Sequence, residues 1–461
     1  MACWRLLLCV GLSLTCATPA EAQTAKPAER GWVTAWTAST QGPYPLGFAA
    51  SQPDLEFALP SAERGASDQS FRLILRPDIW ARETRIRLSN AFGTKPLTFD
   101  DVMLGLEMNG GALVPRSNHP VTFAGKPGVT LQPGQSLVSD RVILPFVKDR
   151  NDPLLASRKL AVSFHVVGES GPITWHASAL GTSYLSGPGS GSHAREEGEA
   201  GFPFSTSSWF FLDEVEMEAP ASHAIVTFGD SITDGAGSTF NGDDRWADVL
   251  SRRLHAALGS TFSVVNAGIS GNMVMGPENY AAEPFAGGPS AIARLDRDVI
   301  ALHGVDKVIW LEGINDFGRA SAEPGKVEDG VRDIVKRLRA GIPGVKIYMG
   351  TLTSALNSTV SGYGTQEVDA KRRAYNDFIR LAGIFDGVVD FDAATLDART
   401  GELKPEFQPS STGGGGDKLH PNRAGHAAMA NAVSFPMLLG LRNVGRRTEP
   451  HYVMRPAQPG Q

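Results

Sequence analysis

The sequence predicts an antiparallel β-sandwich followed by an α/β unit in which helices cover both faces of a mostly parallel sheet. Three observations lead to this fold class. The chain has 461 residues, a length typical of roughly two or three domains. Up to about residue 218, apolar and polar residues alternate as they do in half-buried strands. After Pro220, short apolar runs alternate with stretches of helical periodicity.

Strand-like patterns separated by turns fill residues 31–218. Residues 84–90, 139–146 and 160–167 each alternate between polar and apolar side chains. Clusters of Gly, Pro, Asn and Asp separate the runs, and residues 187–192 form a loop rich in Gly and Ser. Several short strands joined by regular turns are typical of an antiparallel sandwich. We therefore expect a β-sandwich accessory domain over residues 31–218.

Five short apolar runs follow, each long enough for a buried strand, with helical patterns between them over residues 246–258 and 327–338. This alternation predicts a second domain over residues 222–445 with a mostly parallel sheet, followed by a C-terminal tail, 446–461. The long connections 273–289 and 353–368 follow strand ends, so we expect them to border a functional site. The five runs are residues 224–228, 262–266, 308–311, 345–349 and 388–391.

The first residues have the three parts of a secretory signal peptide. Arg5 supplies a positive charge, residues 6–15 are mostly apolar, and Ala20-Glu21-Ala22 forms a cleavage site of the A-x-A type. We expect a signal peptide over residues 1–22, a disordered segment 23–30 after it, and a secreted or periplasmic protein. The apolar stretch is shorter than the roughly 20 residues that span a bilayer, and no later stretch is long enough. We therefore expect no stable membrane insertion.

All the cysteines of the chain, Cys3, Cys9 and Cys16, lie in this signal segment. The mature chain would then have no thiol, which excludes disulfides, thiolate metal sites and cysteine catalysis. Lipidation of Cys16 is the alternative, although Ser13-Leu14-Thr15 fits a lipidation motif poorly. The formal charge of −6 argues against a nucleic acid as partner. The oligomeric state is not determined by the sequence.

Gly229-Asp230-Ser231 stands directly after the apolar run 224–228, and a helical pattern begins a few residues later. The serine hydroxyl therefore falls at the carboxyl end of a predicted buried strand, where open α/β sheets hold their ligands. A serine becomes a nucleophile when a base takes its proton, and that base needs an acid that orients it. Both partners have to come from other segments.

Asp417 and His420 offer an acid and a base within one turn. A carboxylate three residues before a histidine can accept a hydrogen bond from its Nδ1–H, which leaves Nε2 facing the serine. The Gly-rich run 413–416 precedes them, and we expect Pro421 to open a C-terminal helix. The histidine is thus placed on a loop tip that can reach another strand end. For this segment alone, a helix-capping Asp beside a surface His is the alternative.

Two further strand ends supply hydrogen-bond donors for an oxyanion. The segment 266–272 follows the second predicted strand, and a glycine in such a turn can present its backbone N–H to a ligand. Asn315 follows the third strand and offers a side-chain amide. The backbone N–H of Ser231, at the start of a helix, is a third donor. Each segment alone is also explained by a turn that needs Gly or Asn for positive φ.

Together the four segments resemble those of the SGNH subgroup of the GDSL hydrolases, over roughly residues 222–440. The resemblance implies a flavodoxin-like α/β/α sandwich for this catalytic domain, and the motif positions show no departure from the family pattern. It implies Ser231 as the nucleophile, His420 as the general base and Asp417 as its orienting acid. Gly271 and Asn315 correspond to the oxyanion donors, together with the Ser231 amide. The segments 32–36 and 87–93 are similar to the β-rich domain that precedes some secreted members.

The resemblance implies hydrolysis of carboxylic esters through an acyl-enzyme, with no metal and no cofactor. Export and an accessory β domain favour acetyl or other short-chain acyl groups on a carbohydrate, so the partner would be a small-molecule or glycan ester. Lipid and aryl esters are the alternative substrates. The alternative of another class is a glycan-binding protein with an inactive hydrolase domain. The tryptophans of the β domain fit glycan binding and a sandwich core equally well.

Two other hydrolytic mechanisms find less support in the sequence. A G-x-S-x-G nucleophile elbow is absent, which argues against an ordinary α/β-hydrolase. An acidic cluster could bind a metal together with His420 and His426, but no H-E-x-x-H spacing occurs. Helix capping and solvation explain these acids better, and we assign no chemical role to Asp234 or to Asp316. The cluster consists of Asp230, Asp234, Asp243 and Asp244.

Overall fold

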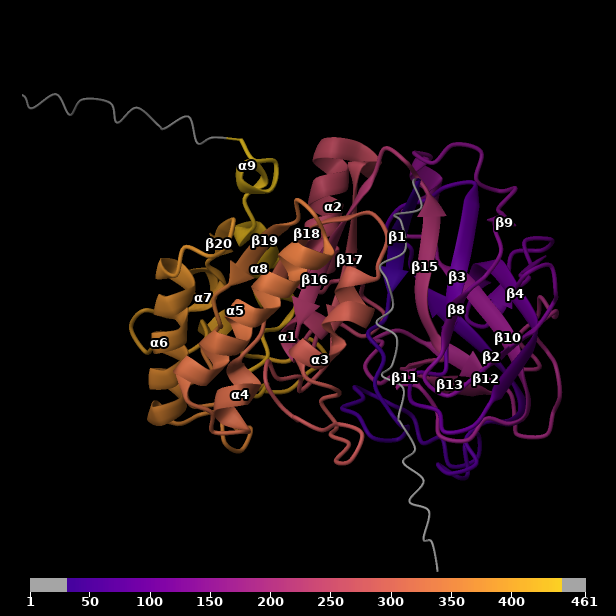
Figure 1. Cartoon of the computed structure of the whole chain (residues 1–461), viewed down its shortest axis with the longest axis horizontal. Helices are drawn as coiled ribbons and strands as arrows, with labels where there is room; N and C mark the ends of the chain where they lie inside the picture. Colours follow the sequence, from indigo (N-terminus) through magenta and orange to yellow (C-terminus); the bar gives the residue numbers. More distant parts are fainter. Residues whose placement is uncertain (1–30, 442–461) are drawn as a thin grey trace, which may run out of the picture.

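The computed structural model describes residues 31–441, in two regions that lie side by side in Figure 1. We call residues 31–218 the β-rich region and residues 222–441 the α/β region. The expected signal peptide, the segment 23–30 and the tail 446–461 lie outside the described residues, as do positions 442–445 of the expected second domain. Within residues 31–441, no helix has both the length and the apolar character needed to cross a membrane.

Antiparallel strands build the β-rich region, as the alternating pattern predicts. One sheet has the strand order β1-β15-β3-β8, with β9 beside β3, and a larger sheet has the order β13-β12-β2-β10-β4-β5, with β6 and β7 beside β4. Completely buried phenylalanines such as Phe71, Phe99 and Phe164 pack ring against ring in the core. The strands are β1 (Trp32–Thr37), β2 (Ser67–Leu75), β3 (Glu83–Ser89), β4 (Leu97–Asn109), β5 (Ala112–Leu113), β6 (His119–Pro120), β7 (Val129–Leu131), β8 (Ser136–Val138), β9 (Val142–Ile143), β10 (Leu160–Glu169), β12 (Ser183–Leu185), β13 (Phe204–Thr206) and β15 (Leu212–Glu218), with a separate pair β11 (Trp175–His176) and β14 (Trp209–Phe210).

The expected strand over residues 139–146 is mostly wrong, because only Val142–Ile143 pairs with β3. Asp140 interrupts the extended chain. Its carboxylate accepts hydrogen bonds from the backbone amides of Ala124 (3.0 Å) and Gly125 (2.7 Å), which fold a neighbouring turn onto it. Pro145, farther along, has no N–H to offer a ladder. The other two alternating runs form β3 and β10 as predicted.

A five-stranded parallel sheet with the order β17-β16-β18-β19-β20 forms the centre of the α/β region. Numbered along this region, that order is 2-1-3-4-5, as in flavodoxin. Each of the five predicted apolar runs contributes a strand, although the last strand ends at Val389 because Asp390 caps helix α7. Helix α2 packs on α8 and α8 on α7, whereas α5 packs on α3 and α6, so the helices form two groups. The elements are β16 (His223–Gly229), β17 (Phe262–Gly268), β18 (Val305–Leu311), β19 (Lys346–Gly350), β20 (Gly387–Val389), α1 (Ser231–Asp234), α2 (Trp246–Leu258), α3 (Ala291–Leu295), α4 (Ile314–Gly318), α5 (Pro324–Gly341), α6 (Gln366–Leu381), α7 (Phe391–Thr395), α8 (Arg423–Ala432) and α9 (Phe435–Leu438).

Helix α8 begins at Arg423, so the expectation that Pro421 opens it is wrong by two residues. Asn422 sets the start. Its side-chain oxygen accepts hydrogen bonds from the backbone amides of Ala424 (2.9 Å) and Gly425 (3.1 Å), which caps the first turn. Pro421 stays in the connection between the cap and His420.

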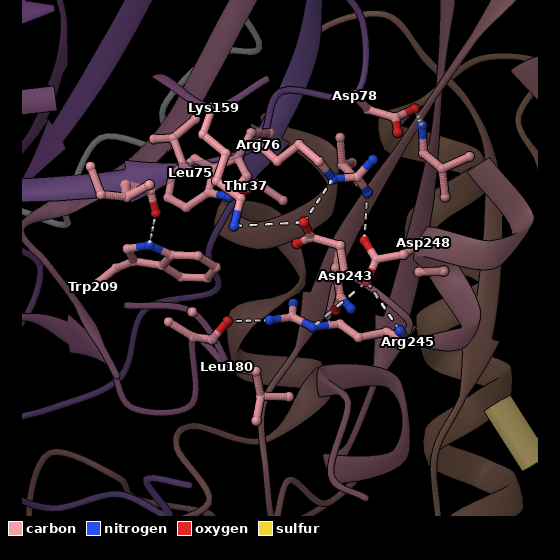
Figure 2. A pocket seen from close by; sticks show the side chains of 18 of the residues that line it. Thr37, Leu75, Arg76, Asp78, Lys159, Leu180, Trp209, Asp243, Arg245 and Asp248 are labelled. Carbon is pink, nitrogen blue, oxygen red and sulfur yellow. Dashed lines mark hydrogen bonds and ion pairs between the residues drawn. The ribbon is translucent and has the colours of Figure 1, made fainter. Parts of the chain in front are cut away.

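The two regions meet along the edge strands β1 and β17 of their sheets. The Ser263 hydroxyl of β17 donates a hydrogen bond to the carbonyl oxygen of Thr34 in β1 (2.8 Å). A pocket of about 60 Å³ lies between the regions, and in it Arg76, after β2, lies 2.8 Å from a carboxylate oxygen of Asp248 in α2 (Figure 2). The residues that line this pocket include none of the predicted site residues. Polar contacts thus fix the β-rich region against the α/β region.

Candidate active site

The predicted site residues lie beyond the carboxyl ends of three adjacent strands. Ser231 follows β16, Gly271 follows β17 and Asn315 follows β18. The strands end level with one another, because Gly229 of β16 pairs with Gly268 of β17 and with Leu311 of β18. The chain order of the sheet reverses at β16, and such a switch point is where open α/β sheets bind ligands.

Ser231, His420 and Asp417 form a hydrogen-bonded chain. The Ser231 Oγ lies 2.9 Å from His420 Nε2, and His420 Nδ1 lies 2.6 Å from Asp417 Oδ2. The Ser231 side chain is nearly buried, with 6% of the residue exposed. The alternative for this segment, a helix-capping Asp beside a surface His, does not fit, since Asn422 caps α8 and Asp417 faces the imidazole.

Asp417 also shapes the turn that carries the histidine. Its Oδ1 accepts hydrogen bonds from the backbone amides of Leu419 (2.9 Å) and His420 (2.8 Å). Partial burial raises the pKa of Asp417, but the hydrogen bonds and charge of His420 outweigh it and lower the pKa to about 2. The carboxylate therefore stays ionised at any pH near neutrality and holds a proton on Nδ1 of His420.

Ser231 begins the short helix α1, and two neighbours explain its sharp entry. Asp230 caps the helix by accepting a hydrogen bond from the amide of Ile232 (3.0 Å). At Gly229 a Cβ atom would lie 2.1 Å from the carbonyl oxygen of Leu311, so the position accepts only glycine. The tight approach of β16 to β18 thereby sets the place of the serine.

The predicted oxyanion donors are the backbone amides of Ser231 and Gly271 and the side-chain amide of Asn315. Within residues 31–441, the amides of Ser231 and Gly271 have no hydrogen-bond acceptor. Asn315 donates from Nδ2 to the carbonyl oxygen of Asn272 (2.8 Å), which places its amide beside Gly271. A carbonyl oxygen only accepts, so this contact fixes which end of the Asn315 amide is Nδ2. The second Nδ2 hydrogen remains for a ligand.

Tyr363 holds the other end of that amide, and the sequence did not single it out. Its hydroxyl donates a 2.6 Å hydrogen bond to Asn315 Oδ1, and the ring is buried. Tyr363 belongs to the connection 353–368, which we expected to border a site. The same connection contacts the proposed acid, since the Ser358 hydroxyl donates to the carbonyl oxygen of Asp417 (2.8 Å). The length of this connection was its only sequence signal.

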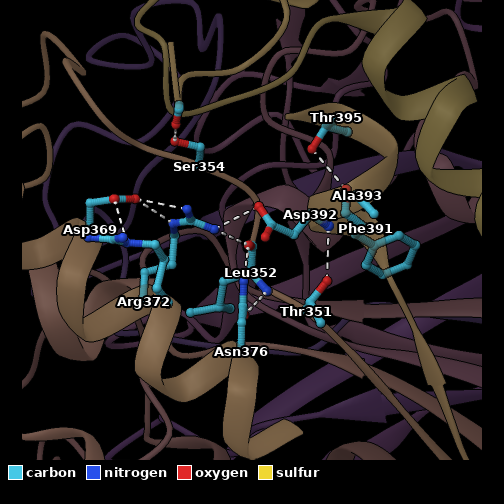
Figure 3. Close-up of polar contacts among 12 residues, drawn as sticks. Thr351, Leu352, Ser354, Asp369, Arg372, Asn376, Phe391, Asp392, Ala393 and Thr395 are labelled. Carbon is cyan, nitrogen blue, oxygen red and sulfur yellow. Dashed lines mark hydrogen bonds and ion pairs between the residues drawn. The ribbon is translucent and has the colours of Figure 1, made fainter. Parts of the chain in front are cut away.

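Buried polar contacts anchor the start of that connection (Figure 3). Arg372 of α6 donates from Nη1 to the carbonyl oxygen of Leu352 (3.0 Å) and to Asp392 Oδ1 (2.7 Å). Asn376 donates to the same carbonyl (2.9 Å) and accepts from the Leu352 amide (2.7 Å). The segment that leads to Tyr363 is therefore fixed to the helical layer.

Arg294 is a second residue that the sequence did not reveal. It is almost completely buried and donates hydrogen bonds to the carbonyl oxygens of Gly229 (2.8 Å) and Ala267 (2.7 Å) and to Asn272 Oδ1 (2.7 Å). These contacts join the end of β16 to the end of β17. Arg294 thus fixes the spacing between the segments that carry Ser231 and Gly271.

Buried acids lie behind the site. Burial raises the pKa of Glu312 to about 7 and that of Asp316 to about 6. Asp316 accepts hydrogen bonds from the amides of Val274 (2.9 Å) and Met275 (3.1 Å), so it has a structural role in the loop after Gly271. Burial, reinforced by the nearby Glu312, also raises the pKa of Asp230.

The β-rich region reaches the site at three points. Gly271 has φ +83°, and a Cβ atom there would lie 2.4 Å from the ring of Phe48. His176 Nε2 lies 3.2 Å from Asp234 Oδ1 behind Ser231. Ser39 Oγ accepts a hydrogen bond from Arg294 (3.2 Å). No pattern in residues 31–218 predicted these contacts, because they depend on how the two regions pack.

The acids considered as metal ligands lie in separate contacts. Asp234 accepts from the Ser270 amide (2.8 Å), and Asp243 lies 3.7 Å from Lys159. Burial lowers the pKa of His426 to about 4, and its Nδ1 accepts from the amide of Trp246 (3.2 Å). Among residues 31–441, the potential ligands that do gather within 4.8 Å of one another are Glu214, Glu216 and His303, where Arg87 and Arg85 pair with the carboxylates.

Comparison with known proteins covers mainly the α/β region. Residues 227–428 match the model of the GDSL-like Lipase/Acylhydrolase family. No curated protein matches the chain. Similar solved structures include a carbohydrate acetylesterase family member from Sinorhizobium meliloti (18% identity, 48% of this chain and 100% of that chain, TM-score 0.36). Others are an aryl esterase from M. smegmatis (19%, 46% and 96%, 0.35) and a GDSL-like lipase from Bacteroides thetaiotaomicron (16%, 47% and 89%, 0.34).

These structural similarities carry no conclusion about substrate, since their TM-scores stay below 0.5. The family match, by contrast, includes the strand ends and turns that carry Ser231, Gly271, Asn315, Asp417 and His420. Residues 227–428 form a GDSL-like lipase/acylhydrolase domain, and the chain is a carboxylic ester hydrolase.

Proposed function

We propose that the protein is a serine esterase in which Ser231, His420 and Asp417 form the catalytic triad. The observation that carries this proposal is the chain of contacts from Ser231 Oγ to His420 Nε2 (2.9 Å) and from His420 Nδ1 to Asp417 Oδ2 (2.6 Å). The geometry is that of a nucleophile, a base and an orienting acid. Residues 222–445 would be the catalytic domain and residues 31–218 a domain that adds to the mouth of the site.

In the first step, Ser231 Oγ attacks the carbonyl carbon of the ester while its proton passes to His420 Nε2. The C–O π pair moves onto the carbonyl oxygen, and the ionised Asp417 stabilises the imidazolium. When the tetrahedral intermediate collapses, the alcohol leaves with the proton from Nε2 and an acyl-serine remains. In the second step, water gives a proton to Nε2 and attacks the acyl carbon. Collapse then returns that proton to Ser231 Oγ and releases the acid.

The oxyanion of each intermediate would lie among the amides of Ser231 and Gly271 and the side chain of Asn315. The two backbone amides have no acceptor within residues 31–441, and the Asn315 amide is oriented by Asn272 and Tyr363. Donors held in place before the reaction stabilise the developing charge without reorganisation. This arrangement supports acyl transfer.

The proposed substrates are short-chain acyl esters, above all acetyl esters, of a carbohydrate, and the proposed location is the periplasm or the exterior. The predicted signal peptide supports export. The position of Phe48 beside Gly271 supports a β-rich region that takes part in substrate binding. The alternative is that the protein hydrolyses lipid or aryl esters, as an esterase of the same family with another substrate.

The test is acid release from p-nitrophenyl esters, from acetate to dodecanoate. Ser231→Ala should abolish hydrolysis. Ser238→Ala is the matched control, because the Ser238 hydroxyl is buried nearby without a hydrogen-bond partner in residues 31–441. Activity restricted to acetate would support a deacetylase, and a maximum at long chains would support a lipid esterase. Wild-type turnover in Ser231→Ala would contradict the proposed mechanism.

A further inference from the structure

Arg319 lies beside the proposed oxyanion hole, directly after helix α4, which carries Asn315. Its backbone N–H donates a hydrogen bond to the carbonyl oxygen of Asn315 (3.0 Å), which fixes the two residues relative to each other. The residue is exposed, and within residues 31–441 no carboxylate comes within ion-pair distance of its guanidinium. A positive charge is therefore presented to solvent at this edge of the site.

Two aromatic rings, one from each region, hold the guanidinium. Its carbon lies 4.8 Å from the ring centre of Phe48 and 5.6 Å from that of Phe285. The two rings meet edge to face, with centres 6.3 Å apart. Phe48 comes from the β-rich region and is 37% exposed. A guanidinium stacked on rings is attracted to their faces and keeps N–H groups at its edge for a planar anion.

The Phe48 ring contacts one proposed oxyanion donor, and the Arg319 guanidinium approaches the residue that positions another. The ring of Phe48 lies so close to Gly271 that a Cβ there would be 2.4 Å from it. The guanidinium of Arg319 interacts with the hydroxyl of Tyr363, which donates to Asn315 Oδ1 at 2.6 Å. One ring and one hydroxyl therefore separate Arg319 from the place where the ester carbonyl would lie.

We propose that Arg319, held between Phe48 and Phe285, binds an anionic group of the ester substrate, so that the enzyme prefers esters carrying a carboxylate or a similar anion near the scissile bond. This inference rests on the proposed esterase function and narrows its substrate class. A charge-assisted hydrogen bond between guanidinium and carboxylate is among the strong polar contacts of proteins. Because stacking already orders the Arg319 side chain, binding costs less conformational entropy.

The anion can belong to the acyl part or to the alcohol part of the ester, and two pairs of probes distinguish these cases. For the alcohol part, 4-acetoxybenzoate is compared with its neutral methyl ester. For the acyl part, p-nitrophenyl hydrogen adipate is compared with p-nitrophenyl hexanoate. The kcat and KM of the wild type, Arg319→Gln and Arg319→Lys are measured on all four probes, with the rate of Ser231→Ala as background.

The expected result is a preference of the wild type for the anionic member of at least one pair. In Arg319→Gln, kcat/KM for that anionic ester should fall about tenfold or more, mainly through KM, as expected for a lost charged hydrogen bond. The neutral member should change less than about twofold, and Arg319→Lys should keep part of the preference. Added salt should weaken the preference in the wild type, because the site is exposed.

A matched control is Arg332→Gln. Arg332 is also exposed and stacks on a phenylalanine, 4.8 Å from the ring centre of Phe378, but it belongs to helix α5. Its variant should keep the wild-type ratio of anionic to neutral rates. Equal losses on both members of each pair in Arg319→Gln, or an unchanged ratio in both pairs, would overturn the anion site. Failure of the esterase function itself would appear differently, as no Ser231-dependent hydrolysis of any probe.

Discussion

The hydroxyl of Tyr363 donates a 2.6 Å hydrogen bond to Oδ1 of Asn315, and this contact orients the side-chain amide proposed for the oxyanion hole. The Asn272 carbonyl holds the opposite end of the same amide. The amide is thus fixed on two sides before any substrate arrives. Such preorganisation is what gives an oxyanion donor its effect.

Tyr363→Phe should therefore lower kcat about tenfold and leave KM within about twofold, because the Asn315 amide loses its restraint at a cost of about 1–2 kcal/mol. Asn315→Ala alone should lower kcat by about 10²- to 10³-fold. In the Asn315→Ala background, Tyr363→Phe should have no further effect on kcat. A full tenfold loss in that background would show that Tyr363 acts by another route.

Asp417→Asn should lower kcat about 10³- to 10⁴-fold. If the new amide oxygen keeps the hydrogen bonds from the Leu419 and His420 backbones, its NH₂ group faces His420 Nδ1. The imidazole then carries its proton on Nε2 and cannot accept one from Ser231. Steady-state kinetics on p-nitrophenyl acetate measure the loss, and circular dichroism establishes that the variant is folded. Activity within tenfold of the wild type would contradict an orienting role.

Glu312→Gln should change the pH dependence of stability. Burial raises the pKa of Glu312 from its usual 4.5 to about 7, so between these values the folded chain binds more protons than the unfolded chain. The free energy of unfolding of the wild type should therefore decrease as the pH rises from about 4.5 to about 7, by up to about 1.4 kcal/mol per pH unit from this group. Glutamine removes that contribution and can still accept from Trp310 Nε1.

Urea unfolding at a series of pH values measures this difference. The free energy of unfolding is plotted against pH from 4.5, the usual pKa of a glutamate, to 7. Its slope over this range should be less negative in Glu312→Gln than in the wild type. Glu406→Gln, which changes an exposed glutamate, is the control and should follow the wild type. Identical slopes for Glu312→Gln and the wild type would show that Glu312 is already ionised at low pH.

A chain that begins at residue 222 should be inactive or insoluble, even though it keeps all the proposed catalytic residues. Its β17 edge would lose the contact with β1, and its site would lose Phe48 and the hydrogen bond from Arg294 to Ser39. Expression of this fragment, assayed on p-nitrophenyl acetate beside the full chain, tests the expectation. A soluble fragment with the kcat/KM of the full chain would make the β-rich region a separable module.

The local patterns of the sequence predicted the architecture well. Period-two alternation predicted β3 and β10, and each of the five apolar runs of the α/β region contributed a strand to one parallel sheet. Such patterns work because a strand's own side chains decide which face is buried. The prediction failed over residues 139–146, where hydrogen bonds to Asp140 from the turn at Ala124 and Gly125 interrupt the strand. A pattern within one segment has no information about that partner.

The same limit applies to the site. Motifs at successive strand ends predicted which residues come together, since adjacent parallel strands bring their carboxyl ends to one edge. Tyr363, Arg294 and Phe48 were not predicted. Tyr363 lies in a long connection that has no recognisable motif. Arg294 has no sequence feature that distinguishes it from other arginines in helices, and Phe48 belongs to the other region. Their contacts with the site depend on tertiary packing, which no single segment encodes.

The turn that carries Asp417 and His420 is held by its own hydrogen bonds and by the Ser358 hydroxyl, which donates to the Asp417 carbonyl oxygen. The chain immediately before it can therefore vary in length without turning the imidazole. At Gly413, Gly414 and Gly415, an added Cβ would meet no atom within 4 Å. An insertion at these glycines could form a flap over the entrance of the proposed site and alter which esters enter it. A protein engineer has a place to attach a fluorophore or a binding peptide close to the proposed active site while leaving His420 untouched.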